Sequence, residues 1–318
     1  MRPSALTRRE LLICAFAAAA PRTTRAAAPV VVGSKLDLEG GLLGQMILLS
    51  LERAGVPTEN RLQIGPTAIA RAALLSGAID LSVEYTGNAA FFFHQEDDEI
   101  WKDAKGGYIR AAELDATRNG LVWLTPAPAD NTWVIAVPAK LAKAASLATL
   151  EDFARFVNAG NRVRLAASAE FVESAAGLPA FETIYGFKLR AAQLLILSGG
   201  ETSATIKAAA DGISGVNAAM AYGTDGALES LGLVALGDPR HAEPVYAPTP
   251  VVRAAALEDY PQIRAALDPV FAGLDLATLR DLNKKVAIEG LPAREVAQTY
   301  LAARGLDHCG HDHCGRDH

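Results

Sequence analysis

Short apolar runs alternate with longer amphipathic stretches along most of the chain. Residues 30–33 are a compact apolar run that predicts a strand, and strands are also predicted at 62–64 and 79–83. Residues 39–54 carry apolar side chains at a helical spacing, and residues 67–75 form an alanine-rich helical stretch. This alternation of strand and helix predicts an α/β protein with parallel sheets.

Two stretches interrupt the alternation and are candidate crossings between domains. Residues 124–131 contain two prolines, and a strand is predicted directly after them at 133–137. Residues 237–246 begin with Gly-Asp-Pro and form the second candidate crossing. Beyond them the chain is predicted to be mainly helical. The helices expected there lie at 257–273, 276–288 and 292–304.

One structural unit is predicted to occur twice. In each copy a Gly-x-Thr sequence opens an alanine-rich helix, and Thr67 and Thr202 are expected to cap the two helices. A strand follows each helix, and Tyr85 and Tyr222 come directly after the predicted strands. Ligands of open parallel sheets bind at the carboxyl ends of strands, so both tyrosines are candidate ligand contacts. The alternative is a chance similarity in an alanine-rich chain.

Four aromatic residues at strand ends or turns suggest the chemistry of a binding site. They are Tyr85, Trp133, Tyr222 and Tyr246. Such residues also serve as ordinary packing anchors. A quaternary ammonium group has no hydrogen to donate, and aromatic faces bind it through their quadrupole, each with about 1–2 kcal/mol when desolvated. Two lobes closing on such a cage would form a hinged receptor.

Composition and charge exclude several other classes of protein. Hydrophobic residues make up 50% of the 318 residues, which is enough for a large core. The net charge of −6 argues against a general nucleic-acid-binding protein, which needs a clustered cationic surface. Gly-x-Ser-x-Gly, a phosphate-binding loop and His-Glu-x-x-His are all absent from the sequence, so we do not expect an enzyme.

Residues 1–26 are predicted to be a cleaved signal peptide. Arg8 and Arg9 precede an apolar run at 11–20, which as a helix would span only about 15 Å, too short to cross a bilayer. The arginine pair resembles a twin-arginine signal, and the alternative is a general secretory signal. Cleavage near Ala26 would remove five Arg and one Glu and change the net charge from −6 to −10. We therefore expect the protein in the periplasm.

Several long stretches of the sequence resemble one family. These are VGSKLDLEGGLLGQMIL, SGAIDLSVEYTGNAAFFF, WLTPAPADNTWVIAV, RLAASAEFVESAAGLPAFETIYGFKL, SGVNAAMAYGTDG and YAPTPVVR. The chain is similar over about residues 29–305 to the substrate-binding proteins of osmoprotectant ABC transporters, most of all to their YehZ (OsmF) glycine betaine-binding subgroup. Members bind glycine betaine, carnitine, choline or proline betaine and present the solute to a permease in the inner membrane.

The resemblance implies a type II periplasmic-binding fold, α/β, with two lobes joined by a two-segment hinge. One lobe would comprise residues 27–130 and 240–305, and the other residues 131–239. By position, the four aromatic residues match the family's aromatic cage.

The resemblance also implies how the carboxylate end of a betaine would be held. Lys35 and Asn88 match positions that contact the carboxylate in the wider family. The family's arginine is missing, because Ser174 stands at its position. A charge-assisted hydrogen bond contributes roughly 1.5–3 kcal/mol, so weak betaine binding or a preference for another solute is expected.

The C-terminal residues 306–318 suggest a second chemistry. Imidazole and thiolate groups at this density suit Zn, Cu or Ni. The candidate ligands are His308, Cys309, His311, His313, Cys314 and His318. The alternatives are an unstructured extension or a Cys309–Cys314 disulfide. The second functional hypothesis is therefore a periplasmic protein that sequesters or delivers metal through this tail, while the first requires no cofactor.

Overall fold

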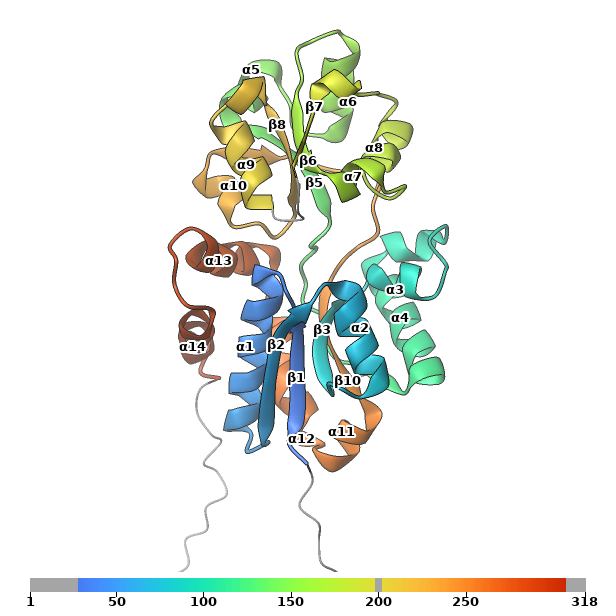
Figure 1. Ribbon diagram of the computed structural model, residues 1–318, viewed down its shortest axis with the longest axis vertical. Helices are drawn as coiled ribbons and strands as arrows, with labels where there is room; N and C mark the ends of the chain where they lie inside the picture. Colours follow the sequence, from blue (N-terminus) through green and yellow to red (C-terminus); the bar gives the residue numbers. More distant parts are fainter. Residues whose placement is uncertain (1–27, 198–201, 307–318) are drawn as a thin grey trace, which may run out of the picture.

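The computed structural model describes residues 28–197 and 202–306, which form two lobes, each built around its own β-sheet (Figure 1). The predicted signal peptide, residues 1–26, lies outside the described residues. Of the predicted tail, only Leu306 is described, so its histidines and cysteines lie outside as well. Among the helices that are described, none is long and apolar enough to cross a membrane.

Lobe I contains the first sheet, with strand order β2-β1-β3-β10-β4. Its strands are β1 (Val30–Lys35), β2 (Thr58–Gly65), β3 (Leu81–Tyr85), β4 (Leu121–Trp123) and β10 (Pro248–Arg253). Its helices are α1 (Leu38–Arg53), α2 (Thr67–Ser76), α3 (Asn88–Phe92), the 3-10 helix η1 (Glu99–Lys102), α4 (Ala104–Asn119), α11 (Ala254–Asp259), α12 (Gln262–Ala272), α13 (Leu276–Ala287) and α14 (Ala293–Ala303).

Lobe II contains the second sheet, with strand order β7-β6-β8-β5-β9. Its strands are β5 (Trp133–Pro138), β6 (Leu165–Ser168), β7 (Leu194–Leu197), β8 (Ala218–Tyr222) and β9 (Leu233–Ala235). Its helices are α5 (Ala139–Ala145), α6 (Leu150–Asn158), α7 (Ala169–Glu173), α8 (Leu178–Tyr185), η2 (Ala191–Gln193), α9 (Thr202–Ala210), η3 (Ile213–Gly215) and α10 (Ala227–Ser230).

Each sheet is covered on both faces, which explains why inner strands such as β1 and β5 are largely apolar. In β1, Val30 and Val32 belong to one core cluster, while Val31 packs against a second cluster on the other face. In β5, Ile135 and Val137 face one core and Ala136 faces the other. Strands buried on both faces lose the alternation of polar and apolar residues seen in half-exposed strands.

The chain crosses between the lobes twice, and the two crossing segments lie side by side. They comprise residues 124–132, between β4 and β5, and residues 236–247, between β9 and β10. Asn131 N donates to Tyr246 O at 3.0 Å, and Tyr246 N donates to Asp130 Oδ1 at 2.8 Å. The connection between the lobes is therefore a hydrogen-bonded pair of extended segments.

The sheets are mixed, so the prediction of parallel sheets was incomplete. β10 runs antiparallel to both β3 and β4, and β5 runs antiparallel to both β8 and β9. Both antiparallel strands directly follow a crossing segment. A strand that enters a sheet from the other lobe does not come from a βαβ unit, and the right-handed crossover rule that makes such units parallel does not apply to it.

Two predicted elements differ in detail from the structure. The helix expected at 257–273 is two helices, α11 and α12, because Pro261 follows the end of α11 and interrupts the helix. Thr67 does not cap α2, since the residue at the cap position is Pro66 and no side chain makes a cap hydrogen bond there. Proline's fixed φ favours the start of a helix without that bond.

Candidate functional site

Trp133 and Tyr222 lie next to each other on lobe II because β5 and β8 are antiparallel. Trp133 is the first residue of β5 and is paired in register with Tyr222, the last residue of β8. The Trp133 ring also packs edge-on against Phe171 at a centroid distance of 5.5 Å. Burial raises the pKa of the Tyr222 phenol to about 12, against the opposing effect of the neighbouring Trp133 side chain, so the phenol is neutral at physiological pH. Two aromatic rings are therefore held together at the edge of the second sheet.

Tyr246 lies in the second crossing segment and packs against the turn after β3. A Cβ atom placed on Gly87 would lie 2.8 Å from the Tyr246 ring, so this close approach requires a glycine. Thr86 fixes the same segment, because its hydroxyl donates to Val245 O at 2.7 Å and accepts from Ala247 N at 3.0 Å. Tyr246 is thus held against the carboxyl end of β3, where Tyr85 is the last residue.

The pKa of Tyr246 links this residue to lobe II. Burial raises the pKa of its phenol far above the ordinary value, and the charges of Glu243 and Asp130 raise it further. The Tyr222 phenol has the same effect. Because the backbone of Tyr246 pairs with Asn131, two residues before Trp133, the crossing segment lies close to the start of β5.

Tyr85 is almost fully buried, and its side chain makes contacts with other residues of the protein. Its side chain and backbone are 7% exposed, and its hydroxyl donates to Glu39 Oε1 at 2.9 Å. Lys35 Nζ lies 4.5 Å from the centroid of the ring. One face of this ring is thus already covered by a cation of the protein.

Lys35 and Asn88 meet at a buried carboxylate that the sequence analysis did not identify. Lys35 Nζ lies 3.0 Å from Glu84 Oε2, and Asn88 Nδ2 donates to the same oxygen at 3.0 Å. Lys35 and Glu84 are both almost completely buried. The sequence signal for Glu84 was a charged residue between Val83 and Tyr85 at the end of a predicted strand. Because Glu84 neutralises Lys35, the positive charge expected for a betaine carboxylate is already balanced.

Glu39, at the start of α1, is a second buried carboxylate that the sequence analysis missed. It accepts hydrogen bonds from Tyr85, from Asn131 Nδ2 at 2.8 Å and from Asn283 Nδ2 at 2.7 Å. Burial raises its pKa, and these hydrogen bonds, together with one from Thr224, oppose that effect. The three donors lie 46, 92 and 244 positions away from Glu39 in the sequence, so no local sequence pattern could predict this site.

Ser174 occupies the position at which the resemblance to the wider family predicts an arginine. It follows α7 as the cap residue, and its hydroxyl accepts a hydrogen bond from Ala176 N at 3.3 Å. The same short helix carries Phe171, the residue that packs against Trp133. A short, neutral side chain therefore stands near the aromatic pair of lobe II and adds no cation.

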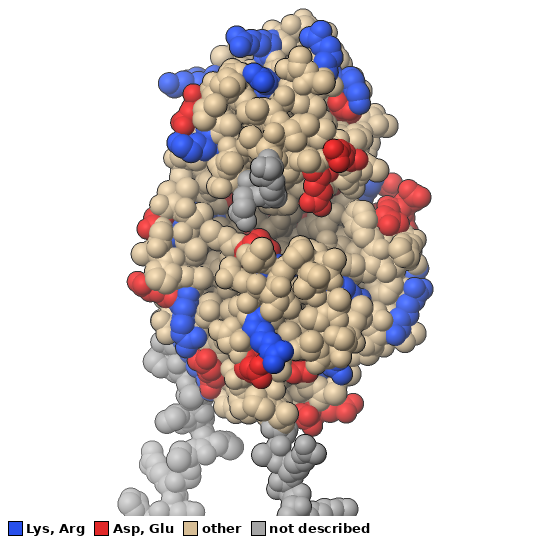
Figure 2. Space-filling model, in the orientation of Figure 1, with Lys and Arg blue, Asp and Glu red and all other residues tan. Residues whose placement is uncertain are grey.

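The surface is hollowed between the two lobes, and acidic side chains lie on both sides of the hollow (Figure 2). The strands that end in Tyr85 and Tyr222 belong to different lobes, so the predicted site residues form a lobe I group, a lobe II group and Tyr246 between them.

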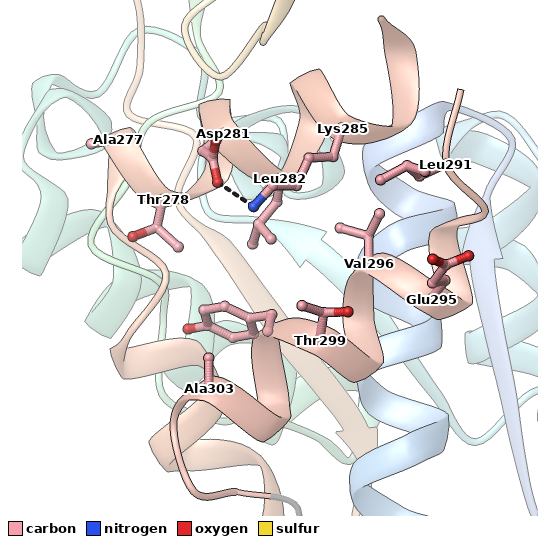
Figure 3. Close-up of a pocket in the computed structure, with 11 residues that line it drawn as sticks. Ala277, Thr278, Asp281, Leu282, Lys285, Leu291, Glu295, Val296, Thr299 and Ala303 are labelled. Atoms are coloured by element: carbon pink, nitrogen blue, oxygen red, sulfur yellow. Dashed lines mark hydrogen bonds and ion pairs between the residues drawn. The ribbon is translucent and has the colours of Figure 1, made fainter. Parts of the chain in front are cut away.

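A separate groove of about 470 Å³ lies between α13 and α14 (Figure 3). Its lining combines aliphatic residues such as Leu282 and Val296 with one aromatic ring, that of Tyr300, and with the exposed ion pair Asp281–Lys285. A single ring cannot surround an ammonium group, so this groove does not match the predicted cage. Among residues 28–197 and 202–306 there is also no group of three His, Cys, Asp or Glu side chains that could hold a metal ion.

Comparison with known proteins identifies the family to which the chain is similar. Residues 28–303 match the family model described as the substrate binding domain of ABC-type glycine betaine transport system. The chain is 55% identical over 281 residues to the glycine betaine-binding protein YehZ of Escherichia coli (strain K12), covering 88% of this chain and 92% of that protein. It is 29% identical to a glycine-betaine-binding protein of Pseudomonas aeruginosa (strain PAO1) over 85% of this chain and 86% of that protein.

Solved structures show the same fold. Apo YehZ from Escherichia coli matches with a TM-score of 0.76 at 55% identity, covering 88% of this chain and all of that one. A glycine betaine/carnitine/choline ABC transporter structure matches with a TM-score of 0.75 at 20% identity, over 88% of this chain and all of that one, which supports the two-lobed fold. Members of this periplasmic family bind a small solute for a membrane permease and are not enzymes. The chain therefore belongs to the family of substrate-binding domains of ABC-type glycine betaine transport systems.

Proposed function

We propose that this protein binds a quaternary ammonium solute such as glycine betaine in an aromatic cage between its lobes and delivers it to an ABC permease in the inner membrane. The observation that supports the proposal is the position of four aromatic residues at strand ends of both lobes and in the crossing segment. Trp133 and Tyr222 pair on lobe II, Tyr246 lies in the crossing segment, and Tyr85 ends the central strand β3. Rings from both lobes would close around the ammonium group.

In this proposal the lobes are the two moving units of the receptor. Lobe I takes residues 27–130 and 240–305, and lobe II takes residues 131–239. The protein reaches the periplasm with residues 1–26 as its cleaved signal, and there it meets the permease.

We expect the binding of glycine betaine to be weak. Lys35 is paired with Glu84, Asn88 donates to the same carboxylate, and Ser174 supplies no charge. A betaine carboxylate would therefore compete with Glu84 for Lys35. Loss of one charge-assisted partner reduces affinity roughly 10- to 100-fold.

Titration calorimetry with glycine betaine tests both parts of this proposal. Trp133→Ala should weaken binding by about 5- to 30-fold, since one cation–π contact is worth about 1–2 kcal/mol when desolvated. Ser174→Arg should tighten binding by roughly 10- to 100-fold, because it restores a bidentate partner for the carboxylate. Tyr108→Ala, which removes a half-buried aromatic ring from α4, is the matched control and should leave affinity unchanged.

Two outcomes would contradict the proposal. Unchanged affinity in Trp133→Ala would contradict the aromatic cage. Sub-micromolar binding of glycine betaine by the unmodified protein would contradict the expectation of weak binding but not the cage.

A further inference from the structure

A buried hydrogen-bond network joins the two lobes on one side of the crossing segments. Its centre is Glu39, which is 6% exposed and accepts from Asn131 and Asn283. Each of these amides also donates to Thr224 of lobe II, Asn131 to Oγ1 at 2.7 Å and Asn283 to the carbonyl oxygen at 3.0 Å. One carboxylate of lobe I is thus linked through two amides to a single residue of lobe II.

Helix α13 carries further contacts to the same loop of lobe II. Arg280 Nε donates to Gly223 O at 2.7 Å. Gly226 lies so close to α13 that a Cβ atom there would be 2.2 Å from Lys284 N and 2.5 Å from Arg280 O. The loop 223–226 is therefore held against a helix that belongs, by its position in the chain, to lobe I (Figure 1).

This contact region also determines where two predicted cage residues lie. Tyr85 donates its hydroxyl to Glu39, and Tyr222 precedes Thr224 by two residues. Asp225 Oδ2 accepts from Tyr222 N at 2.7 Å, which ties the strand end to the loop. The position of one tyrosine relative to the other depends on the network between them.

We propose that Glu39, Asn131 and Asn283 form a latch that holds loop 223–226 against α13, limits the separation of the lobes in the ligand-free protein, and thereby positions Tyr85 relative to Tyr222. The three are positioning residues, because they act through the tyrosines and the lobes rather than through the solute. The inference does not require the proposed solute to be correct, since it concerns the protein without ligand.

The latch should behave as a two-state element. A buried carboxylate is tolerated only while its hydrogen bonds are made, so loss of one partner favours hydration of the whole group. Once the network opens, the lobes remain joined by the two crossing segments and by the remaining contacts of α13, such as that of Arg280 with Gly223. Affinity for a solute that bridges the lobes then falls in proportion to the fraction of molecules that remain ready to bind.

Spin-label distance measurements on the ligand-free full chain test this inference. Labels would be attached to cysteines placed at Glu59 of lobe I and Lys207 of lobe II, two exposed positions, with Cys14, Cys309 and Cys314 replaced by serine. Asn283→Leu keeps the approximate size of the side chain and removes both of its hydrogen bonds. We expect it to broaden the interlobe distance distribution and shift it from that of the parent protein.

Two further variants keep the test decisive. Arg280→Ala removes the hydrogen bond of a half-buried side chain to Gly223 and should shift the distribution in the same direction by less, even if Asn283→Leu fails to fold. Asp281→Asn changes an exposed ion pair on the same helix and is the matched control, which should leave the distribution unchanged.

Unchanged interlobe distances in the folded variants would overturn the inference. A lower melting temperature without a change in distance would overturn it as well, because the network would then serve stability alone. If the distances change but glycine betaine does not bind even the parent protein, the latch is supported and the proposed solute is contradicted.

Discussion

Glu243 is a buried acid in the second crossing segment that has no hydrogen-bond partner. The residue is 4% exposed, and neither carboxylate oxygen is bonded. Burial and the negative charges of Asp238 and Asp130 raise its pKa to about 9, while Lys102 opposes the shift. Most Glu243 side chains are therefore protonated at neutral pH, and this neutral state is compatible with their buried position.

Glu243→Gln should remove a pH dependence of stability. In the unfolded chain Glu243 ionises near pH 4.5, whereas in the folded protein it ionises near pH 9. The folded state therefore holds the extra proton in between, and the free energy of unfolding falls as pH rises from 4.5 to 9. The glutamine, which cannot ionise, should raise that free energy by roughly 1–3 kcal/mol at pH 8 and by little at pH 4.

Urea unfolding at both pH values measures this difference. Asp152→Asn is a suitable control for a carboxylate with the opposite behaviour, because its hydrogen bonds to the backbone N–H groups of Ala148 and Thr149 lower the pKa of Asp152. An equal effect of Glu243→Gln at pH 4 and pH 8 would show that folding does not raise the pKa of Glu243.

At the scale of elements, α13 contacts lobe II although its place in the chain assigns it to lobe I. It follows α12 of lobe I, yet its backbone contacts α10 and the loop before it in lobe II. The contact depends on Gly226, since the neighbouring atoms are backbone atoms of α13 that cannot move aside as a flexible side chain would. A glycine was required here by close approach rather than by its φ angle, which lies in the right-handed helical region.

Gly226→Ala should therefore separate α10 from α13. We expect a loss of about 1–3 kcal/mol in the free energy of unfolding, because an added methyl group in a closely packed contact forces the backbone to shift. Gly232→Ala is not a neutral control, since that residue has φ +69°, whereas Gly237→Ala meets only ordinary contacts of 3.6 Å or more. Denaturant unfolding of the Gly226 and Gly237 variants measures the effect, and equal stabilities would contradict it.

At the scale of the whole molecule, a solute held between the lobes should stabilise the protein by mass action. Glycine betaine at high concentration also stabilises proteins in general, because such solutes are excluded from the protein surface. The specific part is the difference between the unmodified protein and Trp133→Ala at equal betaine concentration. We expect a larger rise in melting temperature for the unmodified protein.

Sucrose separates the two contributions in the same thermal scans. It should raise the melting temperature of both proteins equally, because surface exclusion does not depend on the cage. Equal shifts with glycine betaine in the two proteins would contradict binding at Trp133.

Sequence patterns alone predicted the strands and helices that are regular and locally encoded. β1, α1 and α13 were predicted within a residue or two at most ends, since apolar spacing along each segment is a local property. β10, which contains Pro248 and Pro250, was missed because the chain beyond residue 246 was predicted to be mainly helical. The strand still pairs on both sides, and the carbonyls of these prolines accept from Ala127 N and Leu124 N.

What the sequence determined by itself was the α/β class, the positions of Tyr85 and Tyr222 at strand ends, and the family, because each is expressed in short stretches of neighbouring residues. The tertiary structure alone decided which charges are free. It placed Glu84 against Lys35, and it gathered Asn131 and Asn283 around Glu39 from 92 and 244 residues away. Hydrogen bonds and ion pairs of this kind depend on distances in space. For residues far apart in the sequence, those distances are set only by the folded structure.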